Sequence, residues 1–154
     1  DNEELIKKLA LKYKNEKSAY FLGRGLNYST ALEGALKLKE VSYMHAEGFA
    51  GGELKHGALA LIETGVPVIT ITEEDESYEE MRSNIKETKV RGAEVIGIST
   101  KEEEEYDHFI KIPNKGDFQI LSMVPMQLLA YYTAVYRGNN PDKPRNLAKS
   151  VTVK

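Results

Sequence analysis

The segment SAYFLGRGLNYSTALEGALKLKEVSYM, residues 18–44, decides the fold class. It begins with a short apolar run that ends at Gly23, which predicts a buried strand. It continues with apolar residues at helical spacing, and Thr30-Ala31-Leu32-Glu33 fits a capping box, so we expect a helix to start there. A buried strand followed directly by a helix is the repeating unit of α/β proteins.

The same alternation continues on both sides of this segment. EELIKKLALKYK (residues 3–14) predicts an amphipathic helix whose apolar positions are Leu5, Leu9 and Leu11. Further strands are predicted in VPVITITE (66–73), AEVIGIST (93–100) and HFIKIP (108–113), with a charged helix over about residues 76–90. Because these strands lack hydrophobic alternation, we expect a parallel sheet with helices on both faces, a doubly wound α/β fold.

A stretch without any charged residue, Phe118 to Tyr136, predicts a buried helix. A membrane span is disfavoured because polar residues interrupt the stretch and no second span accompanies it. The alternative for this helix is a subunit contact, in which case a charge at Ala130 or Ala134 is expected to weaken a dimer.

Composition narrows the classes of function. The chain has 154 residues, 41% hydrophobic and 29% charged, which is ordinary for one globular domain. Its net charge of −3 argues against nucleic acid as a partner. The absence of cysteine excludes thiolate chemistry, no histidine pair has metal-ligand spacing with a third ligand, and we expect a cytoplasmic protein without a metal. Asp1 in place of an initiator methionine indicates part of a longer chain.

The loops that follow the first two strands differ in their chemistry. Gly23 and Gly25 imitate a dinucleotide fingerprint, but Tyr28 occupies the place of its third glycine. Ser29 and Thr30 suit a phosphate at a helix N-terminus, or serve only as caps. The next loop, TEEDES (residues 72–77), holds four carboxylates that repel an anion, so another polypeptide must hold the phosphate of any phosphosugar.

A charged strip lies on the helix of the first segment. Glu33, Lys37 and Glu40 fall within roughly 60° of each other on an otherwise apolar helix. This pattern favours a solvent-facing ridge with an i,i+4 ion pair over the alternative, a carboxylate base in a cleft. Pattern alone leaves both interpretations open.

A glycine-rich stretch, HAEGFAGGELKHGALALI (residues 45–62), follows the helix and predicts a loop that approaches a ligand or partner. His56 lies in it beside Lys55 and Gly57, so we expect an exposed imidazole. His45, at a predicted helix end, and His108, at a strand start, are interpreted as structural.

Two runs of this sequence resemble a known protein family. The runs over residues 22–62 and PRNLAKSVTVK (144–154) resemble the second sugar isomerase (SIS) domain of the glucosamine-6-phosphate synthase family, from about Leu5 to the last residue. The motifs ALEGALKLKE, GELKHG and NLAKSVTV are together highly specific. The resemblance implies a flavodoxin-like, three-layer α/β/α sandwich with a mostly parallel sheet, a single SIS domain over residues 1–154 with a catalytic tail at 138–154, and conversion of fructose 6-phosphate to glucosamine 6-phosphate in amino-sugar biosynthesis.

The resemblance also implies roles for individual residues. Glu40 would move the proton between C1 and C2 of the sugar, and His56 would open the ring, presented to the neighbouring subunit's site. Lys149 would form an imine with the C2 ketone, and small Ala148 would let the substrate approach. Glu33 and Lys37 would support this constellation, and no cofactor is implied.

The implied partners lie outside this chain. They are a first SIS domain whose serine and threonine hydroxyls hold the phosphosugar, a glutaminase domain with a cysteine nucleophile, and a second copy in a homodimer. The isolated domain is therefore expected to be inactive. The alternatives are a stand-alone phosphosugar-binding regulatory domain, against which TEEDES counts, and a domain that mainly supports dimerisation.

Overall fold

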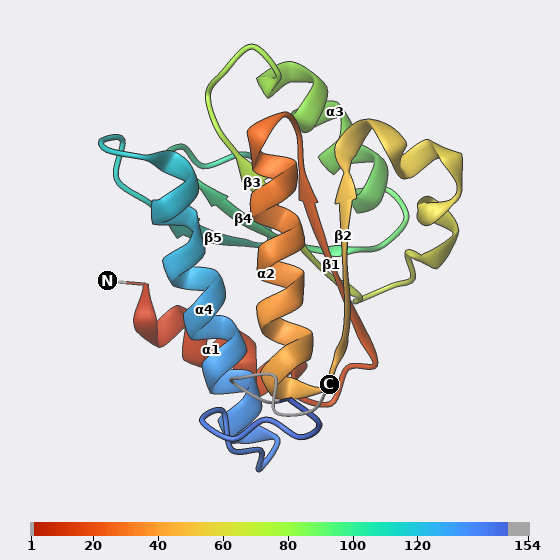
Figure 1. Ribbon diagram of the computed structural model, residues 1–154. Helices are drawn as coiled ribbons and strands as arrows, with labels where there is room; N and C mark the ends of the chain where they lie inside the picture. Colours follow the sequence, from red (N-terminus) through yellow and green to blue (C-terminus); the bar gives the residue numbers. More distant parts are fainter. Residues whose placement is uncertain (1, 148–154) are drawn as a thin grey trace, which may run out of the picture.

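A computed structural model describes residues 2–147 as an α/β fold around one five-stranded sheet (Figure 1). The strands are β1 (Ser18–Gly23), β2 (His45–Ala50), β3 (Pro67–Thr72), β4 (Glu94–Ser99) and β5 (His108–Lys111). Neighbouring strands pair in parallel in the order β2-β1-β3-β4-β5. This is the flavodoxin-like strand order, so the predicted fold class is confirmed.

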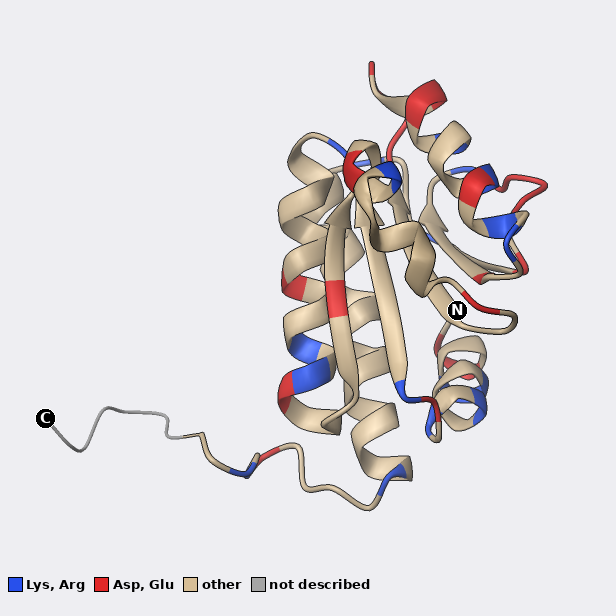
Figure 2. Ribbon diagram, turned by 90° about the vertical axis from the view of Figure 1, so that its right-hand side faces the viewer, with Lys and Arg blue, Asp and Glu red and all other residues tan. Residues whose placement is uncertain are grey.

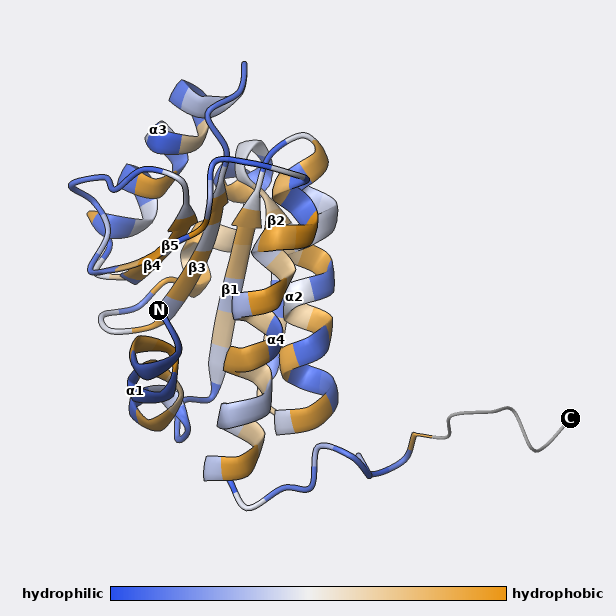
Figure 3. Cartoon of the chain, turned by 90° about the vertical axis from the view of Figure 1, so that its left-hand side faces the viewer, coloured by the Kyte–Doolittle hydropathy of each residue, from blue (hydrophilic) through white to orange (hydrophobic). Residues whose placement is uncertain are grey.

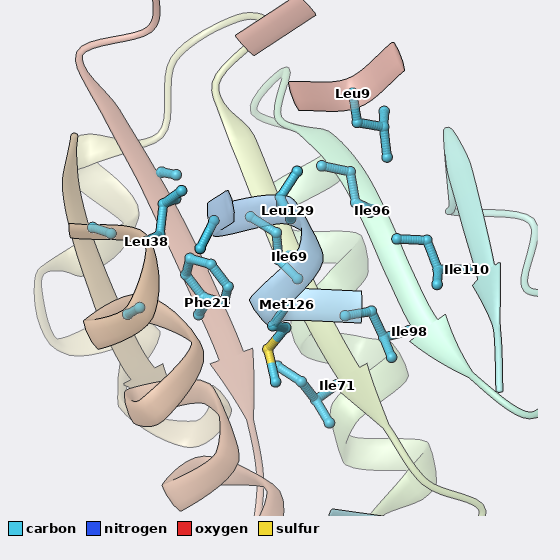
Figure 4. Packing of buried hydrophobic residues seen from close by; sticks show 14 of the residues in the cluster. Leu9, Phe21, Leu38, Ile69, Ile71, Ile96, Ile98, Ile110, Met126 and Leu129 are labelled. Atoms are coloured by element: carbon cyan, nitrogen blue, oxygen red, sulfur yellow. The ribbon is translucent and has the colours of Figure 1, made fainter. Parts of the chain in front are cut away.

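Helices cover both faces of the sheet. On one face lie α1 (Glu3–Tyr13), α2 (Leu26–Ser42) and α4 (Phe118–Tyr136), and on the other lie α3 (Tyr78–Lys89) and the short 3₁₀ helices η1 (Gly51–His56) and η2 (Ala58–Leu61). Each face has its own hydrophobic core. The core under α1, α2 and α4, drawn in Figure 4, includes Phe21, Ile69, Ile71, Ile96, Ile98, Ile110, Met126 and Leu129. The molecule is thus the expected three-layer sandwich.

Two glycines allow α2 to lie close to its neighbours. A Cβ added at Gly23 would lie 2.1 Å from the backbone oxygen of Asn27, in the first turn of α2. A Cβ added at Gly34 would lie 2.3 Å from Sδ of Met126 on α4. No side chain fits at either position without displacing a neighbour, so glycine there fixes α2 against β1 and α4.

The start of α2 differs from the prediction. The helix begins at Leu26, and the residue before it, Gly25, has φ +54°. This turn reverses the chain directly after β1, so the capping box predicted at Thr30–Glu33 is wrong. Ser29 and Thr30 lie in the second turn of α2, the first exposed and the second buried.

The glycine-rich stretch is also more regular than expected. Strand β2 and helices η1 and η2 occupy most of it, so the predicted loop is wrong, and His45 starts a strand instead of ending a helix. The strand contains Gly48, where a Cβ would lie 2.9 Å from the Cα of Leu32 on α2. The glycine therefore serves close packing of strand and helix, which local sequence does not reveal.

Two helices bury other faces than expected. Helix α1 buries Ile6, Leu9, Ala10 and Tyr13, while Leu11 is exposed. Helix α4 is the one helix among residues 2–147 long and apolar enough to span a membrane, yet it packs against α1, α2 and the sheet. It is not buried all round, because a stripe at helical spacing stays exposed: Ile120, Val124, Tyr131 and Val135. Figure 3 shows α2 and α4 side by side, with hydrophobic positions on both helices. Ala130 and Ala134 are instead in the core.

Candidate active site

The charged strip of α2 forms a connected group of side chains. Nζ of Lys37 donates a hydrogen bond to Oε2 of Glu40 at 2.8 Å and lies 3.4 Å from Oε1 of Glu33. The hydrogen bond to Glu40 raises the pKa of Lys37, against partial burial, which lowers it. Lys37 therefore remains an ammonium at neutral pH. It can orient the Glu40 carboxylate and stabilise negative charge, but it cannot act as an amine nucleophile.

Two residues of this strip, Lys37 and Glu40, line a pocket, while Glu33 is exposed. A cavity of ≈ 730 Å³ has α2 as one wall and the segment after α4 as the other, and its lining residues are Lys37, Glu40, Val41, Pro141, Asp142, Lys143, Pro144 and Leu147. Its volume is in the range of small-molecule sites. Figure 2 shows charged residues gathered toward the C-terminal end of α2, where the chain that follows α4 passes. The pocket favours the interpretation of Glu40 as a base in a cleft.

The segment after α4 is tied to the end of α2 by specific contacts. Helix α4 ends at Tyr136. Asn139 then donates from Nδ2 to the backbone oxygen of Ser42 at 3.0 Å. The backbone N–H of Arg145 donates to the hydroxyl of Tyr43 at 2.8 Å, and the Arg145 guanidinium lies 4.1 Å from the centre of the Tyr43 ring. Ala148 and Lys149 lie outside the described residues.

Tyr43 has an unusual backbone conformation. It follows the last residue of α2 with φ +60°, and its N–H donates to the backbone oxygen of Lys39 at 3.1 Å. This left-handed position at a helix end is usually glycine, and a residue with a Cβ costs about 1 kcal/mol or more there. Tyr43 therefore occupies a position where glycine would have the lower backbone energy.

His56 lies far from Glu40 within the chain. It is exposed at the end of η1, which follows the carboxyl end of β2. Helix α2 runs antiparallel to the strands, so its residue Glu40 lies toward the amino edge of the sheet, about 21 Å along the helix from Leu26. The structure therefore brings Glu33, Lys37 and Glu40 together, and leaves His56 at the other edge.

The carboxyl edge of the sheet is occupied by a polar network that the sequence did not reveal. Oε2 of Glu73 accepts hydrogen bonds from Nδ2 of Asn27 at 3.1 Å and from Nε2 of Gln119 at 2.9 Å, and Gln119 also donates to Asn27. Glu73 thus places its own negative charge beside the first turn of α2. The cavity beside it measures only ≈ 190 Å³ and is also lined by Glu74. This arrangement agrees with the expectation that the TEEDES loop repels an anion.

The other histidines have acidic neighbours without forming a metal site. Nε2 of His108 lies 2.7 Å from Oε1 of Glu94, and His45 is 3.8 Å from Glu47. Over residues 2–147, no group of three histidine or carboxylate side chains has a geometry suited to a metal ion.

Comparison with known proteins identifies relatives that match nearly the whole chain. The chain is 52% identical to the glutamine–fructose-6-phosphate aminotransferase (isomerizing) of Thermococcus kodakarensis and 49% identical to that of Clostridium perfringens. Each alignment covers 99% of this chain and 26% of the relative, so the chain spans about a quarter of the length of these proteins.

Solved structures show the same fold. The C-terminal domain of glucosamine-fructose-6-phosphate aminotransferase from Francisella tularensis superposes with a TM-score of 0.85 at 36% identity, over 92% of this chain and 42% of that one. Glucosamine-6-phosphate deaminase from Thermotoga maritima has a TM-score of 0.68 at 27% identity, over 97% of this chain and 47% of that one. The family described as SIS domain matches residues 12–137. The resemblance noted in the sequence is confirmed, and the chain belongs to the SIS domain family.

Proposed function

We propose that this chain is the second isomerase subdomain of a glutamine–fructose-6-phosphate aminotransferase that converts fructose 6-phosphate to glucosamine 6-phosphate in the cytoplasm. One observation carries the proposal: Glu40, held by Lys37, lines a pocket whose other wall is the chain that leads to Lys149. Leu147 lines this pocket, and two residues of chain span at most about 7 Å. The lysine amine and the carboxylate can therefore act on one substrate.

The chemistry follows from these two groups. The Lys149 amine adds to the C2 ketone, and loss of water leaves an imine. Ammonia then adds to C2 and displaces the Lys149 amine, which frees the lysine and leaves an imine of ammonia at C2. This imine acidifies the C–H bonds at C1. Glu40 takes a proton from C1 and returns it at C2, while the Lys37 ammonium keeps the carboxylate oriented. Glu33 supports Lys37 from the preceding turn. Ala148 next to Lys149 leaves room for the sugar.

Other parts of the site come from outside this chain in our proposal. The carboxylates that follow β3 do not suit the phosphate of the sugar, so a first SIS domain of the parent chain holds it, and a glutaminase domain supplies ammonia. His56 is exposed at the edge of the sheet away from Glu40, and it serves the site of the neighbouring subunit, where it opens the sugar ring.

Exposed apolar side chains on α2 and α4 support a homodimer in this proposal. Val124 and Tyr131 on α4, and Leu32 and Leu36 on the neighbouring α2, are each at least two-fifths exposed. Introducing a charge at Val124 or Tyr131 is expected to weaken the dimer in sedimentation experiments. Ala130 and Ala134 are unsuitable positions for this test, since they are 2% and 0% exposed and a charge there disrupts the core. A full-length protein that is a strict monomer contradicts this part of the proposal.

The catalytic assignment is tested in the full-length protein. Lys149→Ala and His56→Ala should each reduce conversion of fructose 6-phosphate at least 100-fold, and borohydride should trap a sugar adduct on Lys149 of the unaltered protein. His45→Ala, which changes another exposed histidine, and Lys154→Ala, which changes another lysine of the tail, should leave turnover unchanged. Full turnover in Lys149→Ala without a trapped adduct in the unaltered protein rejects the assignment.

A further inference from the structure

The contact between Tyr43 and Arg145 combines two unusual features. Residues 2–147 contain two residues other than glycine with a positive φ, Tyr43 and Asn146, and both have φ +60°. Tyr43 is one partner of this contact, and Asn146 directly follows the other partner, Arg145. Strained backbone persists where the surrounding contacts determine it, and such positions concentrate at functional sites.

We propose that Tyr43 and Arg145 are positioning residues that hold the C-terminal segment across the Glu40 pocket, an inference that rests on the function proposed above. We call their contact the Tyr43–Arg145 anchor. The tyrosine hydroxyl accepts the backbone N–H of Arg145 at 2.8 Å, and its ring faces the guanidinium at 4.1 Å. A single side chain thereby fixes both the backbone and the side chain of Arg145.

A second tie lies six residues earlier in the segment. Asn139 donates to the backbone oxygen of Ser42, the residue before Tyr43. Both ends of the segment 139–145 are therefore attached at the end of α2, to Ser42 and to Tyr43, two and three positions after Glu40. The pocket wall from Pro141 to Pro144 lies between these ties, and Leu147 lies just beyond them. The anchor thus sets the position from which the chain continues to Lys149.

The two side chains have chemical properties that their nearest substitutes lack. Glycine at position 43 would relax the backbone but would remove both contacts to Arg145. Phenylalanine would keep the ring and lose the hydroxyl acceptor. Lysine at position 145 would keep the charge but lose the flat guanidinium that stacks on an aromatic ring. The anchor accounts for a tyrosine where local backbone energy favours glycine.

The experiment compares four variants of the full-length protein: Tyr43→Gly, Tyr43→Phe, Arg145→Ala and Arg145→Lys. Tyr43→Gly and Arg145→Ala should lower kcat about 10- to 100-fold, because displacement of a reacting group by about 1 Å costs up to 100-fold. Tyr43→Phe and Arg145→Lys should each retain more activity than the variant that removes the whole contact. The amount of sugar trapped on Lys149 by borohydride should fall in the same order. KM should change less than threefold, since the proposed phosphate site lies on another domain.

Measurements of stability distinguish a positioning role of the anchor from a structural role. Tyr43→Gly should leave the thermal midpoint unchanged or raise it, because it removes backbone strain. Arg145 lies in a segment outside the sheet and helices, so Arg145→Ala tests the anchor even if Tyr43→Gly does not fold. The amide of Arg145 should exchange with deuterium faster in Tyr43→Gly than in the unaltered protein.

A matched contact elsewhere on the surface serves as control. Nζ of Lys7 lies 5.4 Å from the ring of Tyr132, whose hydroxyl contacts Glu3. Lys7→Ala and Tyr132→Phe should leave kcat and trapping unchanged. Unaltered kcat and trapping in both Tyr43→Gly and Arg145→Ala would overturn the anchor, as would an equal loss in Tyr132→Phe. These results leave the proposed function intact, because that function is rejected only by the outcome stated for Lys149→Ala.

Discussion

The two ends of α2 differ in how their polar groups are used. At the start, Asn27, Glu73 and Gln119 satisfy one another, and Gly23 lets the first turn contact the strand directly. At the end, Lys37 and Glu40 line a pocket, and the chain turns through a strained tyrosine. Ligands of open α/β sheets usually bind at the carboxyl edge, which here is the end whose polar groups are already paired. The proposed chemistry therefore lies at the other end of α2, where Lys37 and Glu40 line the larger of the two cavities.

The test with the largest expected effect replaces one carboxylate near each end of α2 by the corresponding amide. Glu40→Gln in the full-length protein should reduce kcat about 100- to 10,000-fold, because a general base is lost. Glu73→Gln should keep kcat within about threefold and cost about 1 kcal/mol of unfolding free energy, since only a charged hydrogen-bond acceptor is weakened. Steady-state kinetics and urea titration measure the two effects. An equal loss of kcat in both variants reverses the roles assigned to the two ends.

A second test asks whether the middle of α2 holds the two ends in place. Gly34→Ala should lower the unfolding free energy by about 1–3 kcal/mol, because the new methyl group meets Met126 and Phe21. Gly52→Ala is the control, since its methyl group meets only the end of the Arg24 side chain. If Gly34→Ala is as stable as the control in urea titration, α4 does not clamp the middle of the helix.

The smallest expected effect concerns pH and the amino edge of the sheet, where Glu94 starts β4. Burial raises the pKa of Glu94, but hydrogen bonds with Lys12 and His108 outweigh it, so the pKa lies below its ordinary value of 4.5. A lowered pKa in the folded state stabilises the fold above pH 4.5, and this contribution is lost as pH falls through the folded value.

The prediction is a steeper loss of unfolding free energy between pH 5 and pH 3 in the unaltered protein than in Glu94→Gln, by about 1 kcal/mol or less. Urea titrations at several pH values measure it. Glu53→Gln, an exposed carboxylate, should keep the steep slope. Identical slopes for Glu94→Gln and the unaltered protein contradict the assigned role of Glu94.

Much of the fold was predictable, because its central strands are continuous apolar runs. Strands β1, β3, β4 and β5 lie where the sequence predicts them. Strand β2 was missed, since it is an edge strand whose Gly48 is explained only by packing on Leu32. The start of α2 was missed because a single glycine conformation, at Gly25, replaces a side-chain cap.

The part of the site that lies on a single helix was predictable from the sequence. The spacing of Glu33, Lys37 and Glu40 on one helix places them together, and the structure does so. The contact of Tyr43 with Arg145 joins residues 102 positions apart, and no periodicity reports such a pair. Because the helix was predicted to continue to His45, the position of Tyr43 directly after α2 was evident only from the structure.

The pocket draws its walls from distant parts of the chain, since Glu40 and Pro141 are 101 positions apart. All five strands are complete by Lys111, so the sheet can assemble during synthesis before α4 has been made. The residues that close the pocket are then synthesised after the whole sheet. A chain whose translation stops before Asn139 therefore acquires the whole sheet and carries Glu40 without an opposite wall.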